Sequence, residues 1–339
     1  MKRQFAVAAF LLLALAFAVC AAPADSETAQ LKMSKKAGKL MAKALKAIQD
    51  EQPDRAIELL QEVSTLEPEN AMVRHNLGVL FFDKGLTAEA ISNFEVALRL
   101  QPDYQNALLA LRQALLEAGK KASSEQALDK SNEHLLKLNG LAVPPAENVG
   151  LRASACYLLG FNYFNLKQYE KADDYFAKCQ AVEGLKDANR DLYANATYFL
   201  GMMGHIQGNY ESSSENFRTY LGLYAGSETQ PEFFSHANYF IGANLFRLLE
   251  ARLAKGEVAN MAAEAADIIP YLEQAIAAGI PSEDAHVMLG NCHVYRKQYE
   301  KAVQAYQKLI TVFPQSPQRQ NYEAFLAELQ KMSPQDKKK

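Results

Sequence analysis

Residues 71–104, AMVRHNLGVLFFDKGLTAEAISNFEVALRLQPDY, decide the fold of this chain. They predict a helix, a tight turn and a second helix. Gly78 and Ala90 are small, so two antiparallel helices can approach closely there, and Phe94 is large enough to fill the space above them. Gly85 can adopt the left-handed conformation that ends a helix. This stretch therefore predicts one helical hairpin.

The hairpin pattern recurs along the chain. A unit of 34 residues that carries Leu-Gly, an aromatic residue, Ala, Phe, Ala and a closing Pro102 resembles the tetratricopeptide (TPR) repeat. A Leu-Gly or Ile-Gly pair returns at Leu159-Gly160, Leu200-Gly201, Ile241-Gly242 and Leu289-Gly290. The glycines at 160, 201 and 242 are 41 residues apart, and the next interval is 48, so the later repeats carry insertions.

The resemblance covers about nine-tenths of the mature chain and implies the fold class. That class is all-α: a right-handed α-solenoid of about six or seven TPR-like helical hairpins with a C-terminal capping helix. We expect the cap at 318–332, where Tyr322, Phe325 and Leu329 share one face. We also expect Gly119 to end the first helix of a degenerate third repeat, and Pro270 to start the second helix of the sixth.

Composition and pattern divide the chain into six segments. These are a signal peptide at 1–21, a flexible tether at 22–36, an N-terminal TPR lobe at 37–138, a Pro/Gly linker at 139–150, a C-terminal TPR lobe with its capping helix at 151–331, and a basic tail at 332–339. The linker is assigned because two prolines and two glycines in a short span cannot be helical throughout.

The first residues have the pattern of a secretory signal peptide. Lys2 and Arg3 precede an apolar run at 5–19, and small residues follow it. The run is short for a membrane span, which needs about 20 residues. We therefore expect export, most simply to the bacterial periplasm. Two other outcomes stay open. One is lipidation of Cys20, although the bulky Val19 before it departs from the pattern of a bacterial lipoprotein signal. The other is retention of the signal as an anchor.

Charge and motifs exclude several functions. The net charge of −3 gives no argument for nucleic acid or an anionic membrane surface as partner. The chain has no nucleophile elbow, phosphate loop, dinucleotide fingerprint or zinc-protease helix, so we expect neither an enzyme nor a cofactor. The six histidines lack the spacing of metal ligands. Three cysteines follow the signal peptide; a bridge between Cys156 and Cys179 and small buried thiols are both open alternatives.

The resemblance also implies where a partner binds. In this family the first helix of each repeat lines the concave face, and four of its positions point into it. In the fourth to sixth repeats these positions predict a groove of Tyr157, Phe161, Phe164, Tyr198, Met202, His205, His236, Tyr239 and Phe246. Rings and thioethers suit an apolar segment of a partner protein. A register error of one residue would turn a side chain by about 100° and make these rings core instead.

The function that follows is a non-enzymatic protein–protein interaction scaffold or adaptor in the bacterial cell envelope. It would hold a partner segment in the concave groove, in envelope assembly, secretion or a transporter-associated role. Membrane attachment is expected only if Cys20 is lipidated or the signal is retained. The alternative is a periplasmic carrier of a small ligand or lipid that uses the aromatic groove.

Overall fold

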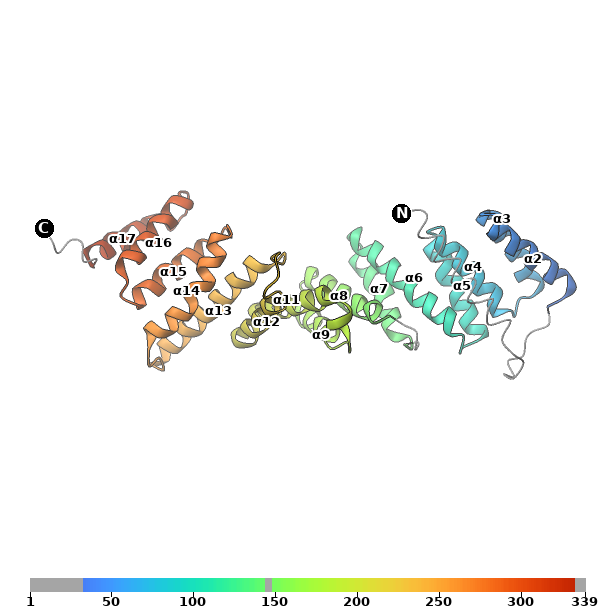
Figure 1. Ribbon diagram of the computed structural model, residues 1–339, viewed down its shortest axis with the longest axis horizontal. Helices are drawn as coiled ribbons and strands as arrows, with labels where there is room; N and C mark the ends of the chain where they lie inside the picture. Colours follow the sequence, from blue (N-terminus) through green and yellow to red (C-terminus); the bar gives the residue numbers. More distant parts are fainter. Residues whose placement is uncertain (1–32, 144–147, 333–339) are drawn as a thin grey trace. The chain divides into compact units, whose positions relative to one another are not determined.

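The computed structural model describes residues 33–143 and 148–332, which form sixteen helices and no β-strand (Figure 1). The predicted signal peptide at 1–21, most of the tether and almost all of the basic tail lie outside these residues. The predicted all-α fold of helical hairpins is confirmed. Within the described part of the chain, no helix has the length and apolar character needed to span a membrane.

The chain divides into two compact units after Leu166. The first contains α2 (Lys35–Gln49), α3 (Pro53–Leu66), α4 (Ala71–Asp83), α5 (Thr87–Leu100), α6 (Gln105–Ser124), α7 (Leu128–Gly140) and α8 (Val149–Asn165). The second contains α9 (Tyr169–Gln180), α10 (Leu185–Ala188), α11 (Arg190–Gln207), α12 (Tyr210–Gly222), α13 (Phe234–Lys255), α14 (Met261–Ala277), α15 (Glu283–Tyr295), α16 (Tyr299–Val312) and α17 (Arg319–Met332). The linker predicted at 139–150 falls inside the first unit, so the division by contacts and the division by composition do not coincide.

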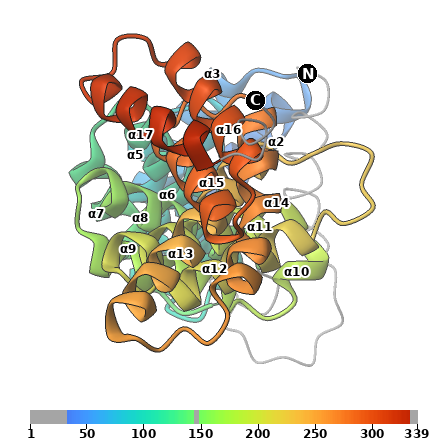
Figure 2. The same cartoon turned by 90° about the vertical axis from the view of Figure 1, so that its left-hand side faces the viewer.

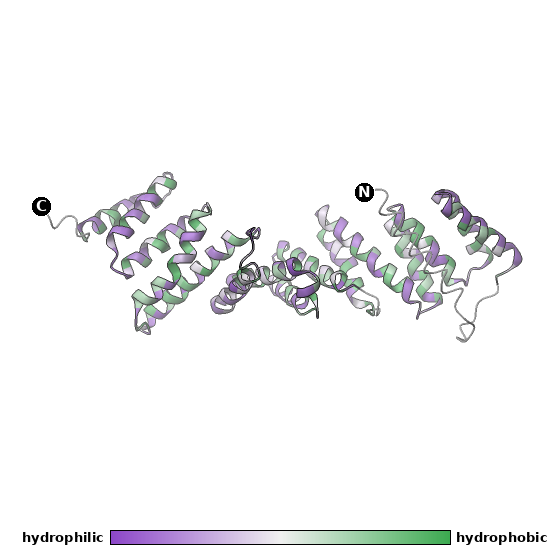
Figure 3. Cartoon of the chain, viewed as in Figure 1, coloured by the Kyte–Doolittle hydropathy of each residue, from purple (hydrophilic) through white to green (hydrophobic). Residues whose placement is uncertain are grey.

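Successive helices pack as hairpins within each unit. The pairs are α2 with α3, α4 with α5 and α6 with α7 in the first unit, and α11 with α12, α13 with α14 and α15 with α16 in the second. In many of the helices hydrophobic and hydrophilic residues lie on different sides, and the apolar side packs against a neighbouring helix (Figure 3). The predicted capping helix is α17, which packs its Tyr322, Phe325 and Leu329 against α16 and is at the front in Figure 2.

In several of these pairs, a glycine on the first helix and a large side chain on the second fix how closely the two helices approach. A Cβ atom added to Gly78 would lie 2.5 Å from the ring of Phe94, so only glycine fits there. The same arrangement joins Gly119 to Leu135, Gly201 to Phe217 and Gly290 to Tyr306. The size pattern that predicted the hairpins is therefore the pattern that packs them.

Two expected helix boundaries are wrong. Gly119 does not end a helix, because α6 continues to Ser124 and Gly119 lies buried inside it against Leu135. Its small size outweighs the low helix propensity of glycine. Pro270 does not start a helix either: it lies inside α14. A proline there removes the hydrogen bond that its own N–H would have made, and its ring crowds the carbonyl four residues earlier. The packing of the flanking Ile269 and Leu272 in the core keeps the helix continuous.

Candidate functional site

The nine residues of the predicted groove come from both units. Tyr157, Phe161 and Phe164 lie on α8 in the first unit, and all three are half-buried. The other six lie on α11 and α13 in the second unit. The predicted lining is therefore not one continuous set within either unit.

Two of the predicted groove residues belong to the core. Tyr198 is 4% exposed; its ring stacks on Phe233 at 4.5 Å between centroids and meets Phe217 edge-on at 5.4 Å. Phe246 is also 4% exposed and stacks on Tyr295 at 6.3 Å. Their assignment to the groove is wrong, and the core alternative applies to both. For Tyr198 the reason is the inserted chain before α13, which brings Phe233 over the ring.

Four predicted residues of the second unit remain at the surface: Met202 and His205 on α11, and His236 and Tyr239 on α13. We call these four the α11–α13 face, since the two helices are in contact. His236 is exposed and the other three are half-buried. The Nδ1 atom of His205 lies 2.6 Å from Asn244 Oδ1, which holds the imidazole in place. The face thus combines a thioether, a phenol and two imidazoles.

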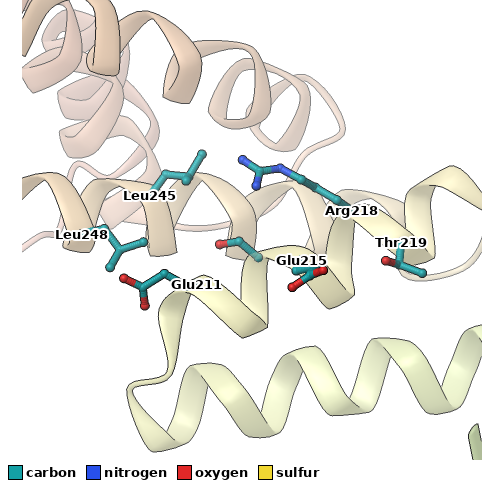
Figure 4. A pocket seen from close by; sticks show the side chains of 7 residues that line it. Glu211, Glu215, Arg218, Thr219, Leu245 and Leu248 are labelled. Carbon is teal, nitrogen blue, oxygen red and sulfur yellow. The ribbon is translucent and has the colours of Figure 1, made fainter. Parts of the chain in front are cut away.

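A groove that the sequence did not predict lies between α12 and α13 (Figure 4). Its volume is about 530 Å³. Its lining is Glu211, Ser214, Glu215, Arg218 and Thr219 from α12, with Leu245 and Leu248 from α13. In the sequence, the only sign of this groove is the spacing of these α12 residues, which places them on one face of the helix. That sign is weak, because a charged helical face is usually exposed to solvent without binding anything.

Arg218 limits one side of this groove. Its side chain extends from α12 toward α13 (Figure 4), and its Nε donates to the hydroxyl of Tyr271 at 3.4 Å. The guanidinium lies 5.8 Å from the centre of the Tyr271 ring. Arg218 is thus occupied by Tyr271, while Glu211 and Glu215 stand on the same helix without an ion pair among the described residues.

Two further grooves lie in the first unit. One, of about 440 Å³, is bounded by α3, α4 and α5 and includes Arg74. The other, of about 320 Å³, is bounded by α5, α6 and α7 and includes Lys121, Lys130 and His134. None of the nine residues of the predicted groove lines any of these three grooves.

Buried histidines and a cysteine on α15 serve packing. His286 and His293 are each 4% exposed, and burial lowers the pKa of His293 below its ordinary value. Burial likewise raises the pKa of the neighbouring Cys292 thiol to about 12, so it stays protonated and unreactive at neutral pH. Among the described residues, His, Cys, Asp and Glu side chains nowhere gather in a group of three that could hold a metal ion.

Comparisons with known proteins agree with the hairpin packing. Models of the tetratricopeptide repeat match residues 41–105, 153–183 and 284–316. These segments cover α2 to α5, α8 with α9, and α15 with α16. No curated protein matches the chain.

Solved structures with similar folds have low identity. MamA of Desulfovibrio magneticus RS-1 is 20% identical over 58% of this chain and 99% of its own, with a TM-score of 0.36. PilF of Pseudomonas aeruginosa is 15% identical over 75% of this chain and 96% of its own, with a TM-score of 0.42. A tetratricopeptide repeat protein of Parabacteroides merdae is 15% identical over 88% of this chain and 99% of its own, with a TM-score of 0.35. The assignment rests on the three matched segments instead: the chain contains tetratricopeptide repeats in both of its units.

Proposed function

We propose that this protein is a non-enzymatic scaffold that holds a segment of a partner protein. The observation that carries the proposal is the set of recognised tetratricopeptide repeats, which build both units from stacked helical hairpins. Such repeats present long surfaces made of many short helices, and these surfaces suit extended or helical segments of other proteins. The fold alone does not fix the partner.

The partner segment is proposed to bind on the α11–α13 face. Met202 is flexible and polarisable, and Tyr239 offers a ring with a polar edge, so both can adapt to an apolar segment. His205 is held by Asn244, which gives the face one fixed donor-acceptor group beside these adaptable ones. This is a smaller surface than the sequence predicted, because Tyr198 and Phe246 are core residues and because Tyr157, Phe161 and Phe164 lie in the first unit.

The site of action is proposed to be the bacterial cell envelope, with the mature protein in the periplasm. The support is the signal-peptide pattern of residues 1–21. Envelope assembly, secretion and a transporter-associated role all fit an exported scaffold. Attachment to a membrane would follow only from lipidation of Cys20 or from retention of the signal.

A carrier of a small apolar ligand is not favoured. Such a carrier needs an enclosed apolar pocket. The groove between α12 and α13 is lined by two leucines against five polar or charged residues. The aromatic rings that would have lined a ligand pocket are partly used in the core, as Tyr198 and Phe246 show.

Crosslinking in cells, followed by capture and mass spectrometry, tests the scaffold. The wild type is compared with a His236→Ser, Tyr239→Ser variant and with Tyr271→Ser, a matched control because Tyr271 is a half-buried tyrosine on α14, outside the α11–α13 face. All variants are first checked for native helicity. A partner captured by the wild type and the control but lost from the double variant supports the proposal.

Two other outcomes contradict it. Capture of the same proteins by all three forms would show that the α11–α13 face is not the site. Absence of any specific partner would contradict the scaffold itself. Cell fractionation with N-terminal sequencing of the mature chain tests localisation separately: an intact N-terminus in the cytoplasmic fraction would rule out export.

A further inference from the structure

The helix α2 carries a row of lysines and no acidic residue. Its sequence is KKAGKLMAKALKAIQ, and all its lysines are exposed. An α-helix turns by 100° per residue, so four of these lysines lie within about 80° of one another around the helix. We call these four the lysine row: Lys35, Lys39, Lys43 and Lys46. At a rise of 1.5 Å per residue, the row is about 16 Å long.

The other side of α2 is fixed in the core of the first unit. Ala37 and Ala44 are 0% exposed, and Met41 packs with them in one hydrophobic cluster with residues of α3. None of the large apolar side chains that are exposed in the described part of the chain lies on α2. The helix therefore presents charge to its surroundings and keeps its apolar residues for packing.

The lysines of the row have no carboxylate partner among the described residues. Every ion pair within 33–143 and 148–332 is made by other residues. On the neighbouring helix α3, Asp54 pairs with Lys84 of the next hairpin, and Glu58 pairs with Arg55 of α3 itself. The positive charge of the row thus stays uncompensated by salt bridges.

The row also costs the helix stability. Lys35 is the first residue of α2, where the positive end of the helix dipole disfavours a cation, and the first turn holds no acidic residue. Lys35, Lys39 and Lys43 follow one another at intervals of four residues, so like charges are neighbours on the helix surface. Folding alone gains nothing from this arrangement. An anionic surface outside the chain would relieve the repulsion.

We propose that the lysine row binds the anionic surface of a phospholipid membrane. Anionic headgroups spread negative charge over a flat surface, which suits a straight row of point charges. The cations of α2 are all lysines, whereas arginine is the usual residue for directional, paired contacts with carboxylates and nucleic acid. A protein partner would also need an apolar or aromatic anchor, which the exposed side of α2 does not offer.

This contact is reversible and local. Charges alone do not enter the hydrocarbon, so the docking differs from stable anchoring by a lipidated Cys20 or a retained signal. The net charge of −3 for the whole chain does not reveal it, because the positive excess is confined to α2. The row lies in the first unit and the α11–α13 face in the second, so the inference holds or fails independently of the partner site proposed above.

Vesicle flotation of the chain without its predicted signal peptide tests the proposal. The probes are vesicles of phosphatidylcholine alone and vesicles that contain about 30% phosphatidylglycerol. We expect saturable binding to the anionic vesicles only. Raising the salt from about 0.05 M to about 0.3 M should weaken it at least about tenfold, because ions screen exposed charges. Polyglutamate and double-stranded DNA, offered at equal charge, represent an acidic protein and a nucleic acid.

Variants with equal net charge separate the row from the overall charge. Changing Lys35, Lys39 and Lys43 together to Gln should weaken binding about a hundredfold, since each lysine near an anionic surface strengthens it about fivefold. Glutamine has nearly the helix propensity of lysine, so the fold should persist, which circular dichroism checks. The control removes three exposed lysines of α10 and α16 and should bind as the wild type does: Lys186→Gln, Lys301→Gln and Lys308→Gln.

Several results would overturn the inference. One is equal binding to the vesicles with and without phosphatidylglycerol, and another is an equal loss in the control and the row variant. Tighter binding to polyglutamate or DNA than to the anionic vesicles, lost in the row variant, would assign the row to that partner instead. Arginine at positions 35, 39 and 43 keeps the charge and should preserve vesicle binding. Loss of binding there would contradict a contact made by charge alone.

Discussion

Asn162 on α8 and Asn244 on α13 make the same buried hydrogen bond. Each side-chain amide donates at 2.8 Å to the hydroxyl of a serine 31 residues earlier, Ser131 for the first and Ser213 for the second. Each serine hydroxyl in turn donates to the carbonyl of a glycine 12 residues before it. All four side chains are 0% exposed. The bond therefore ties one hairpin to the first helix of the next.

Removing one member of this network should destabilise the fold. Asn244→Leu takes away the amide that donates to Ser213 and that holds His205, so the Nδ1 atom of His205 loses its partner and the Ser213 hydroxyl keeps only its bond to Gly201 O. We expect the free energy of unfolding to fall by about 1–3 kcal/mol. Urea unfolding followed by circular dichroism measures this loss.

Replacing both partners should cost less than the two single changes together. Ser213→Ala is tolerable in itself, because alanine stands at the corresponding place of other repeats in this chain, as at Ala90 and Ala302. In the Ser213→Ala, Asn244→Leu protein the amide and the hydroxyl that bond each other are both absent, so the unpaired Asn244 amide of the Ser213→Ala single variant is avoided, and a coupling energy of about 0.5–3 kcal/mol is expected. Strict additivity of the single effects would contradict a direct bond between the two side chains.

The sequence predicted the hairpins because their packing is local. Gly78 and Phe94 lie in one repeat, so their sizes alone indicate which helices meet. The same signal failed at Gly119, because it was interpreted as a helix end although its smallness serves the contact with Leu135. A glycine in a repeat has two physical uses, and the sequence alone does not distinguish them.

The candidate surfaces were harder to predict for a different reason. Tyr198 is buried by Phe233, which belongs to an inserted segment that has no counterpart in a regular repeat. A repeat pattern cannot say where an insertion folds back. The groove at Arg74 was missed because the position of Arg74 in the repeat is ordinarily a packing position.

The fit between glycine and ring can be tested by adding one methyl group. In Gly78→Ala the new Cβ would lie 2.5 Å from Phe94, so the ring or the helices must move. We expect a loss of about 1–3 kcal/mol in the free energy of unfolding. Gly38→Ala is the control, since it lies inside α2 with nothing within 4 Å and should stabilise the protein by about 0.5–1 kcal/mol. Equal effects of the two changes in thermal unfolding would contradict the packing argument.

A buried arginine holds the end of α7. Arg112 is 1% exposed, and its Nη1 donates to the carbonyls of Leu138 at 2.7 Å and Leu141 at 3.0 Å. Arg112→Leu leaves these carbonyls without that donor, and we expect a loss of about 2–3 kcal/mol. Hydrogen exchange should become faster in α7 first. Arg112→Lys keeps a charged donor group and should lose less; full protection of α7 in Arg112→Leu would contradict the capping role.

Stability should fall as the solution is acidified through the range where histidine titrates. His75 is buried between the rings of Phe94 and Tyr104, with centroids 5.8 and 5.1 Å away. Burial lowers its pKa below the ordinary value of 6.5, against a smaller opposing effect of its hydrogen bond to Asn76. Below pH 6.5 the unfolded chain therefore binds a proton that the folded chain does not. The free energy of unfolding then decreases with falling pH, at no more than about 1.4 kcal/mol per pH unit for this one group.

Replacing His75 isolates its share of this dependence. His75→Phe keeps an aromatic ring in the pocket but cannot titrate, so the slope of unfolding free energy against pH between about 5 and 7 should be smaller than in the wild type. Part of the slope should remain, because burial also lowers the pKa of His293. Urea unfolding at a series of pH values decides the matter: an unchanged slope in His75→Phe would show that this histidine is not buried in its neutral form.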